Sequence, residues 1–364
     1  MTGHTPKVLV LTNQTSPYQV EFMDAIAQAG KVKLQVIYLY SQRPGRNWSQ
    51  PEIKHSHLIL NGDQKRFSEA QRWMNEAELM VFSYYRDAFA FELLQSRAQL
   101  KLPWCFWGER MGVTKFGWAG RLYRWWKLAS LHHSPAAIWG IGEFALERYR
   151  REFGSQRVYR NVPYFSNLSR FSITNPRDFA HNERRILYSG SLIKRKGADV
   201  LAKAFRMASR RCPNLRLTFL GEGPLQAALA DELHGCAGRV TFAGFKDWSE
   251  LPKEYHQADV QCVPSRHDGW GLVVPEGLAA GLPVISTTNT GAARELIQPN
   301  NNGWLVEAGN VPQLAAALES VAQLTADEMM RLSMSATASL ANHSLPAGVN
   351  IFQEAVAASL EAWT

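Results

Sequence analysis

The sequence has 364 residues, 46% of them hydrophobic and 20% charged, and its formal net charge is +8. This balance argues against a disordered chain, the lack of an apolar run of about 18 residues argues against a spanning helix, and the length predicts two domains of ~100–200 residues each. The four scattered cysteines and the lack of a signal-peptide cleavage site predict a protein of the reducing cytoplasm.

Apolar runs alternate with helical stretches along the first half of the chain. The predicted strands are residues 8–12, 34–39, 79–83, 104–107 and 137–140. The predicted helices between them are residues 19–29, 89–99 and 143–153. Such alternation predicts a parallel, doubly wound sheet. Residues 162–183 are rich in Ser, Asn and Pro without helical period, so we expect the crossing between domains there.

A second alternating series follows this crossing. Its predicted strands are residues 186–189, 216–220, 240–243, 260–263 and 283–286. Its predicted helices are residues 199–211, 224–233 and 275–280. The fold class is therefore predicted as α/β with two Rossmann-like domains, residues 1–172 and 173–345. Two such domains leave a cleft where the carboxyl ends of their strands face each other.

The segment from Pro264 to Val306 contains the strongest candidates for ligand-binding and catalytic residues in the sequence. Asp268 and Glu276 are eight residues apart, and Glu276 opens a helix of small residues. The helix dipole favours an ionised carboxylate at such a position. A fixed carboxylate can accept two hydrogen bonds from the vicinal hydroxyls of a ribose.

Glycines surround the first acid in the sequence Gly269-Trp270-Gly271. Glycine lets the backbone approach a ligand closely. The free amides of Gly271, Leu272 and Val273 are therefore candidates to bind a phosphate.

These residues resemble the signature of glycosyltransferase family 4, whose members have the GT-B fold. The family has an acid, seven residues and Glu, then Gly-x-Pro-Val and Gly-x-x-Glu-Leu, which stand here at Asp268, Glu276, residues 281–284 and residues 291–296. Asp268 replaces the Glu that is usual in the family and is one methylene shorter. The resemblance implies that Asp268 lies near the donor hexose at the catalytic centre and that Glu276 binds the nucleotide ribose.

A second match runs from Tyr188 to Gly197, YSGSLIKRKG. It resembles the family's strand and turn with Gly-Arg and Lys-Gly, whose cations neutralise the donor diphosphate as it departs. Lys196 matches the catalytic lysine, whereas Ser191 stands in the place of the arginine, whose charge Lys194 or Arg195 would supply. Turns shared with the family imply further donor contacts at Gly190, Gly244 and Phe245.

The first domain matches the family only loosely. The loop after its first strand lacks the glycines that are frequent in the family, and Ser16 and Tyr18 are candidate cleft residues there or simply a helix entry. Glu109 follows the strand at 104–107 and is the candidate to orient or deprotonate the acceptor hydroxyl; the alternative is a salt bridge with Arg110 or another basic residue. The resemblance also implies that residues 346–364 form a helix that crosses back to this domain.

The positive charge is concentrated in residues 101–170, which hold twelve Lys and Arg against four acids and so account for the whole net charge. The candidate partners of this segment are an anionic membrane surface, a phosphorylated acceptor or a nucleic acid, and the alternative is a solvated basic face. Residues 121–133, RLYRWWKLASLHH, form a predicted helix. Its Trp125 and Trp126 belong either at a membrane interface or in the core.

The turn Gly140-Ile141-Gly142 fits the dinucleotide fingerprint between a strand and a helix, although the acid expected about 20 residues later is missing. We prefer a turn into the last large helix of the first domain. An NAD-dependent oxidoreductase that uses this turn stays open as the alternative function, and NADH binding would discriminate. A nucleic-acid-binding protein is the third hypothesis, which predicts steeply salt-dependent binding.

The resemblance implies a retaining transfer of a hexose from a UDP- or GDP-sugar to a hydroxyl of a glycan or polyprenyl-linked glycan. No two aspartates stand two residues apart, so we expect neither a metal nor another cofactor. The expected setting is cell-surface polysaccharide or lipopolysaccharide synthesis on the cytoplasmic face of the inner membrane. No nucleic-acid partner is expected.

Overall fold

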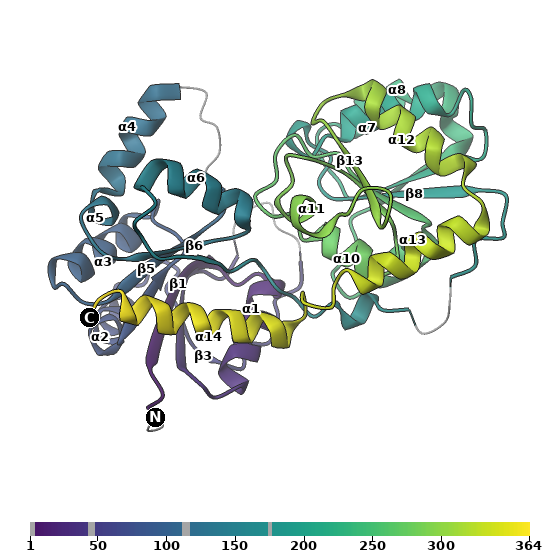
Figure 1. Ribbon diagram of the computed structural model, residues 1–364. Helices are drawn as coiled ribbons and strands as arrows, with labels where there is room; N and C mark the ends of the chain where they lie inside the picture. Colours follow the sequence, from purple (N-terminus) through teal and green to yellow (C-terminus); the bar gives the residue numbers. More distant parts are fainter. Residues whose placement is uncertain (1–3, 43–47, 111–116, 174–176) are drawn as a thin grey trace. The chain divides into compact units, whose positions relative to one another are not determined.

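The computed structural model describes residues 4–42, 48–110, 117–173 and 177–364, apart from the side chains of Gln64 and residues 117–121. The chain divides into two compact units (Figure 1): unit 1 comprises residues 1–167 and 344–364, and unit 2 comprises residues 168–343. The division after residue 167 lies slightly before the predicted boundary at residue 172. Both units are Rossmann-like α/β folds built on a parallel sheet.

Unit 1 has a seven-stranded parallel sheet with the order β3-β2-β1-β4-β5-β6-β7. Its strands are β1 (Lys7–Gln14), β2 (Lys33–Tyr40), β3 (Ser56–Ile59), β4 (Leu79–Phe82), β5 (Trp104–Gly108), β6 (Ala137–Gly140) and β7 (Tyr159–Asn161). Its helices are α1 (Pro17–Gln28), α2 (Gln64–Glu76), α3 (Ala88–Gln99), α4 (Gly117–Lys127), α5 (Ala129–His132), α6 (Glu143–Phe153) and α14 (Leu345–Glu361). The central β1 pairs with β2 on one side and with β4 on the other.

The C-terminal helix α14 belongs to unit 1 although it follows the whole of unit 2 in the sequence. Phe352 packs edge-on against the buried rings of Trp107 and Trp139. The indole nitrogen of Trp139 donates a 2.9 Å hydrogen bond to the hydroxyl of Ser359. These contacts satisfy a buried polar group inside an apolar core, so α14 completes the core of this unit.

Unit 2 has a six-stranded parallel sheet with the order β10-β9-β8-β11-β12-β13. Its strands are β8 (Arg184–Ser189), β9 (Leu215–Leu220), β10 (Val240–Gly244), β11 (Val260–Val263), β12 (Val284–Thr287) and β13 (Gly303–Val306). Its helices are α7 (Ala198–Ala208), α8 (Gln226–Glu232), α9 (Leu251–Gln257), α10 (Val273–Ala279), α11 (Gly291–Leu296), α12 (Val311–Gln323) and α13 (Ala326–Ala338), with short 3₁₀ turns η1 (Leu168–Phe171), η2 (Lys194–Lys196) and η3 (His234–Arg239).

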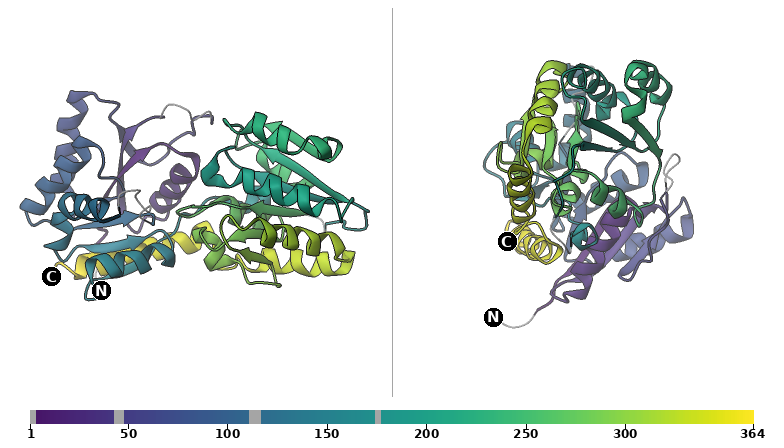
Figure 2. Two further views of the ribbon diagram at one scale, coloured as in Figure 1. Left: turned by 90° about the horizontal axis from the view of Figure 1, so that it is seen from above. Right: turned by 90° about the vertical axis from the view of Figure 1, so that its right-hand side faces the viewer.

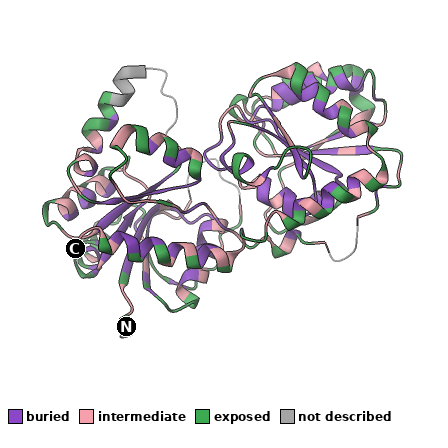
Figure 3. Ribbon diagram, viewed as in Figure 1, coloured by how far each residue is buried: buried purple, intermediate pink, exposed green. Residues whose placement is uncertain are grey.

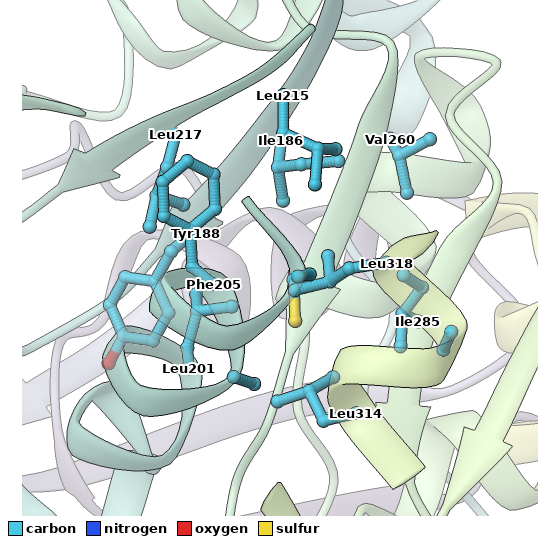
Figure 4. Packing of buried hydrophobic residues seen from close by; sticks show 14 of the residues in the cluster. Ile186, Tyr188, Leu201, Phe205, Leu215, Leu217, Val260, Ile285, Leu314 and Leu318 are labelled. Atoms are coloured by element: carbon cyan, nitrogen blue, oxygen red, sulfur yellow. The ribbon is translucent and has the colours of Figure 1, made fainter. Parts of the chain in front are cut away.

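Alternate residues of β8 point to opposite faces of this sheet, and both faces are covered by helices (Figure 2). Ile186 and Tyr188 pack with residues of α7 and α12 (Figure 4). Leu187, between them, packs in a separate cluster that includes residues of α9 and α10. Burial on both faces explains why the strands of this sheet appear in the sequence as short continuous apolar runs.

The sequence predictions miss the edge strands β3, β7 and β13, which are three or four residues long. They also miss the helices α2, α9, α11, α12 and α13, and they join two other elements. The predicted helix over residues 121–133 is interrupted at Leu128, where the chain leaves α4 and enters α5. Leu128 at this break and Leu131 of α5 are both buried in the core of unit 1.

Candidate functional site

The candidate site lies at the carboxyl ends of β8 and β11. The strand order of unit 2 reverses direction between these two neighbouring strands. In open α/β sheets such a switch point is where ligands bind, because the loops after the two strands lead to opposite faces and leave a crevice. The loop of residues 190–197 follows β8 and the loop of residues 264–272 follows β11, so the fold brings together the two segments that the sequence singles out.

The two loops are held in close contact by glycine. Gly197 has φ +74°, and a Cβ atom there would lie 1.9 Å from the carbonyl oxygen of Pro264. Any larger residue would both strain the backbone and push the loops apart. Gly271, at φ +90°, is similarly constrained, since its Cβ would lie 2.7 Å from Cγ2 of Thr290.

The predicted cation and the predicted first acid form an ion pair. Nζ of Lys196 lies 2.6 Å from Oδ2 of Asp268, whose side chain is largely buried. Nη1 of Arg195 is 3.9 Å from Oδ1 of the same carboxylate and donates a 3.0 Å hydrogen bond to the carbonyl of His267. The structure therefore places Arg195 and Lys196 of this turn beside Asp268, with Arg195 the more exposed of the two.

Arg266 fixes this arrangement and was not identified from the sequence. Its guanidinium binds both carboxylate oxygens of Asp199 on α7, at 2.6 and 2.8 Å, and donates to the carbonyl of Lys194 at 2.6 Å. Its amide donates to the carbonyl of Arg195 at 2.9 Å. Although burial opposes it, the bonds and charge of Arg266 lower the pKa of Asp199 below its usual value. This clamp ties the loop after β11 to the cationic turn after β8.

Glu276 lies in the first turn of α10, where its surroundings oppose ionisation. Burial raises its pKa to about 7, even though the hydroxyl of Tyr255 and the charges of Arg170 and Lys196 act in the opposite direction. The Tyr255 hydroxyl donates a 2.9 Å hydrogen bond to Oε2 and accepts one from Nε2 of Gln261 at 3.2 Å. Burial thus opposes the ionised form that the sequence predicts for this carboxylate.

The other predicted donor residues occupy turns of the same sheet. Gly190 follows β8, and the carbonyl of exposed Ser191 accepts a hydrogen bond from the Tyr188 hydroxyl. Leu272 precedes α10 and Val273 begins it, so their amides lie before the first hydrogen bond inside the helix.

Gly244 is the last residue of β10 and Phe245 follows it, two strands away from β8. Gly244 has φ +72°, and the side chain of Phe245 is 42% exposed. The amide of Phe245 donates a 3.4 Å hydrogen bond to Glu222. These residues are therefore not part of the Lys196–Asp268 contact itself.

In unit 1, Glu109 follows β5 and is exposed. The structure joins it to Tyr18 through a third residue, because the side chain of Tyr164 hydrogen bonds both Tyr18 and Glu109. Burial raises the pKa of Tyr164, so this phenol stays protonated and donates. Arg110, the alternative partner of Glu109, lies over the ring of Phe144 at 3.9 Å.

Ser16 is buried before α1, and its hydroxyl donates to Oε1 of Gln19 at 3.0 Å. The loop after β1 is therefore closed on itself by its own polar side chains.

The turn of Gly140 and Gly142 has a structural explanation. A Cβ atom at Gly140 would lie 2.5 Å from the side chain of Leu146, so glycine lets α6 pack closely on β6. Gly142 has φ +91° and its amide donates to Oδ1 of Asn161 at 3.1 Å. Both glycines thus serve the entry into α6, as the preferred interpretation of the sequence expects.

Several cations of residues 101–170 are used inside the protein rather than presented together. Arg124 pairs with Glu152 at 3.1 Å, and Arg157 donates to three backbone carbonyls. Arg170 lies in unit 2, over the ring of Trp248 at 4.7 Å. Lys115 and the side chain of Arg121 lie outside the described residues. The segment is therefore not one continuous basic face.

Within the described ranges, no helix combines the length and the apolar character needed to cross a bilayer. The same residues contain no cluster of three or more His, Cys, Asp or Glu side chains placed to hold a metal ion. All four cysteines are buried and unpaired.

Comparisons with known proteins point to one family. Residues 169–338 match the family model for glycosyl transferases group 1. Over 215 residues the chain is 31% identical to the GDP-mannose-dependent alpha-(1-6)-phosphatidylinositol monomannoside mannosyltransferase of Mycobacterium tuberculosis, with 54% of each chain covered. It is 34% identical over 162 residues to the amylovoran biosynthesis glycosyltransferase AmsK of Erwinia amylovora, covering 42% of this chain and 39% of that one. The match thus spans about half the length of the first of these relatives and less of the second.

Solved structures match over nearly the whole chain but at low identity. HepE of Anabaena, solved in complex with UDP, superposes with a TM-score of 0.76 at 14% identity, covering 97% of this chain and 100% of HepE. The lipopolysaccharide outer core galactosyltransferase WaaB superposes with a TM-score of 0.70 at 14% identity, covering 97% and 99%. At this identity the likeness shows the shared two-unit fold.

Proposed function

We propose that this chain, whose residues 169–338 form a glycosyl transferases group 1 domain, moves a hexose from a nucleoside diphosphate sugar to a hydroxyl of a glycan or lipid-linked glycan. One observation carries the proposal. Lys196, Arg195, Asp268 and Glu276 are gathered by two loops and the first turn of α10 at the switch point of one parallel sheet. A nucleotide diphosphate needs fixed cations for its phosphates and a carboxyl group for its ribose, and this set provides both.

In the proposed complex, Lys196 and Arg195 bind the diphosphate, and the amides of Gly271, Leu272 and Val273 add their dipoles. Glu276 accepts hydrogen bonds from the ribose hydroxyls while Tyr255 holds its carboxyl group in place. Asp268 orients Lys196, which it contacts at 2.6 Å, and lies beside the hexose. Gly190, Ser191, Gly244 and Phe245 complete the turns around the nucleotide.

The proposed reaction retains the anomeric configuration and uses no metal. The acceptor oxygen forms a bond to the anomeric carbon on the face from which the diphosphate leaves. The bond between that carbon and the phosphate oxygen breaks, and the departing diphosphate takes the acceptor proton. Negative charge grows on the diphosphate in this step, and preorganised cations such as Lys196 stabilise it most where the transition state forms.

Unit 1 is the proposed holder of the acceptor. Glu109, Tyr18 and Tyr164 form a hydrogen-bonded group at the carboxyl ends of its strands. Such a group can bind and orient a sugar hydroxyl without a further charge. An acceptor in cell-surface polysaccharide or lipopolysaccharide synthesis fits the relatives, one of which is named for a phosphatidylinositol mannoside and another for amylovoran. A peripheral location at a membrane surface, through residues 101–170, belongs to this proposal.

A thermal-shift screen with UDP-, GDP-, ADP- and CMP-sugars tests the proposal, because a ligand that binds only the folded state raises Tm. We expect one sugar nucleotide to raise Tm and NADH to leave it unchanged. Glu276→Ala should abolish the response without changing the fold seen by circular dichroism. A rise with NADH alone would support the oxidoreductase, and undiminished sugar-nucleotide binding by Glu276→Ala would remove the basis of the proposal.

A further inference from the structure

Helix α4 presents large apolar side chains to solvent. Leu122, Tyr123, Trp125 and Trp126 are each between 52% and 59% exposed. Figure 3 shows the described part of α4 as largely exposed, at the margin of unit 1. The core interpretation of the two tryptophans is therefore wrong. Single exposed apolar residues are ordinary, but four within five positions of one helix form a patch that needs an explanation.

The four side chains occupy one side of the helix. At 3.6 residues per turn, successive residues are about 100° apart, so these positions fall within an arc of roughly 160°. Arg124 and Leu128 lie on the opposite side and are buried. The usual arrangement of an amphipathic surface helix is therefore reversed. An ion-paired arginine and one leucine face the protein, and the aromatic residues face solvent.

The outward orientation is fixed by contacts on the inner side. Arg124 pairs with Glu152 of α6 at 3.1 Å in a largely buried position. Lys127 lies over the ring of Phe91 of α3 at 3.8 Å and over that of Trp126 at 5.0 Å. These contacts hold α4 against α3 and α6, so turning the aromatic residues inward would break an ion pair and a cation–π contact.

Positive charge accompanies the patch. Arg148 is one turn before Glu152 on α6, on the face directed to α4. Neither Arg148 nor exposed Arg151 forms an ion pair with another described residue. These two arginines of α6 therefore lie beside the aromatic patch and can attract an anionic surface.

We propose that α4 lies in the headgroup region of an anionic membrane, with Leu122, Tyr123, Trp125 and Trp126 inserted toward the acyl chains. Tryptophan and tyrosine suit this boundary because their rings are apolar and their polar atoms remain hydrated. Basic side chains beside the helix add attraction to anionic lipid. The inference rests on the peripheral location proposed above and names the element responsible for it.

The size of the patch favours a membrane over a second copy of the chain. The four side chains expose roughly 500 Å² together, whereas a stable protein interface buries about 800 Å² on each partner. Insertion of a few aromatic side chains, supported by nearby cations, is enough for reversible membrane binding.

Co-sedimentation of the full chain with vesicles tests this inference. We expect binding to vesicles of equal parts phosphatidylglycerol and phosphatidylcholine, and much weaker binding to phosphatidylcholine alone. Trp125→Ser with Trp126→Ser should weaken binding to the anionic vesicles about tenfold or more. Met334→Ser is the matched control, because Met334 is 66% exposed on α13 of unit 2 and should have no effect.

A second pair of substitutions separates charge from insertion. Arg148→Gln with Arg151→Gln should weaken binding and reduce its dependence on salt. Equal binding by wild type and the tryptophan variant would overturn the proposal. So would a wild-type dimer that the variant lacks, seen by light scattering, if neither protein binds vesicles.

The same proteins keep this test separate from the donor chemistry. The tryptophan variant should retain the Tm and the sugar-nucleotide thermal shift of the wild type, since α4 lies in unit 1 and the donor residues lie in unit 2. Loss of vesicle binding with an intact nucleotide response supports the inference. If the chain binds vesicles through α4 but binds no sugar nucleotide, the membrane role of α4 is supported and only the proposed function is overturned.

Discussion

The two units share a parallel sheet but place different chemistry at the carboxyl ends of their central strands. In unit 2 the loops after β8 and β11 bring a lysine, Lys196, to 2.6 Å from a buried aspartate, Asp268. In unit 1 the corresponding edge brings Tyr18, Glu109 and Tyr164 into one hydrogen-bonded group. If unit 2 holds the donor, the difference follows from the ligands: a diphosphate needs fixed cations, whereas an acceptor hydroxyl needs only dipoles and one carboxylate.

The two edges also differ in how their backbones are fixed. In unit 2 a Cβ atom at Gly197 or at Gly221 would lie within about 2 Å of a neighbouring loop's carbonyl oxygen. The loop after β1 in unit 1 contains no glycine and is held by side-chain hydrogen bonds of Thr15 and Ser16. The loop after β8 is therefore fixed by close backbone contacts, and the loop after β1 by side chains, which sequence change can alter more easily.

The largest effect is expected at the cationic turn of unit 2. Lys196→Gln should lower kcat by about 10²–10³, because the charge that grows on the departing diphosphate loses a preorganised partner. Steady-state kinetics with the donor found in the thermal-shift screen would measure it. Lys253→Gln is the matched control, since Lys253 is an exposed lysine of α9.

Asp268→Asn sharpens this prediction. If Asp268 mainly orients Lys196, the double variant should lose little more activity than Lys196→Gln alone, because the two residues act as a unit. Full additivity of the two losses would show that Asp268 has a separate role at the hexose. An unchanged kcat in Lys196→Gln would contradict the proposal that unit 2 uses fixed cations for the donor diphosphate while unit 1 does not.

A smaller effect is expected from the protonation of Glu276. Its pKa is raised to about 7, mainly by burial, and the proposed ribose contact needs the ionised form. Donor affinity should therefore fall about tenfold between pH 8 and pH 6, as the carboxyl group becomes protonated. Calorimetric titration across this range measures it, with Glu276→Gln expected to bind weakly at every pH.

The same shift has an opposite consequence for stability. Because the folded pKa lies above the value in the unfolded chain, the folded state binds more protons between about pH 4.5 and 7, and stability falls as pH rises through this window. Glu276→Gln should lose that dependence and gain stability at pH 8, measured as Tm. A variant less stable than the wild type at pH 8 would contradict the buried, raised-pKa description.

The comparison of the two units also explains which structural features can be predicted from the sequence. Strands buried on both faces produce continuous apolar runs, so β8, β9 and β11 were predicted, and Asp268, Glu276 and Lys196 could be grouped because they lie in ordered motifs. Arg266 and Tyr255 could not, because a clamp to Asp199 and a hydrogen bond to Glu276 join segments whose spacing has no sequence pattern.

The orientation of α4 was beyond the sequence for a related reason. Its mixture of tryptophan and arginine fits a core helix or a surface helix equally well. Contacts with distant segments, such as the pair of Arg124 with Glu152, decide which side faces the protein. The raised pKa of Glu276 likewise depends on burial, which no local sequence pattern reveals.

The smallest effect is expected in unit 1, at Glu109. If the departing diphosphate takes the acceptor proton, Glu109 only orients the hydroxyl, and Glu109→Gln should lower kcat/KM for the acceptor about fivefold, the value of one charged hydrogen bond. The donor thermal shift should not change, and Glu92→Gln on α3 is the control, since Glu92 is likewise an exposed glutamate of unit 1. A loss of 10² or more in kcat, with a lost basic limb in the pH profile, would instead make Glu109 the general base and move the proton transfer from the donor half to the acceptor half.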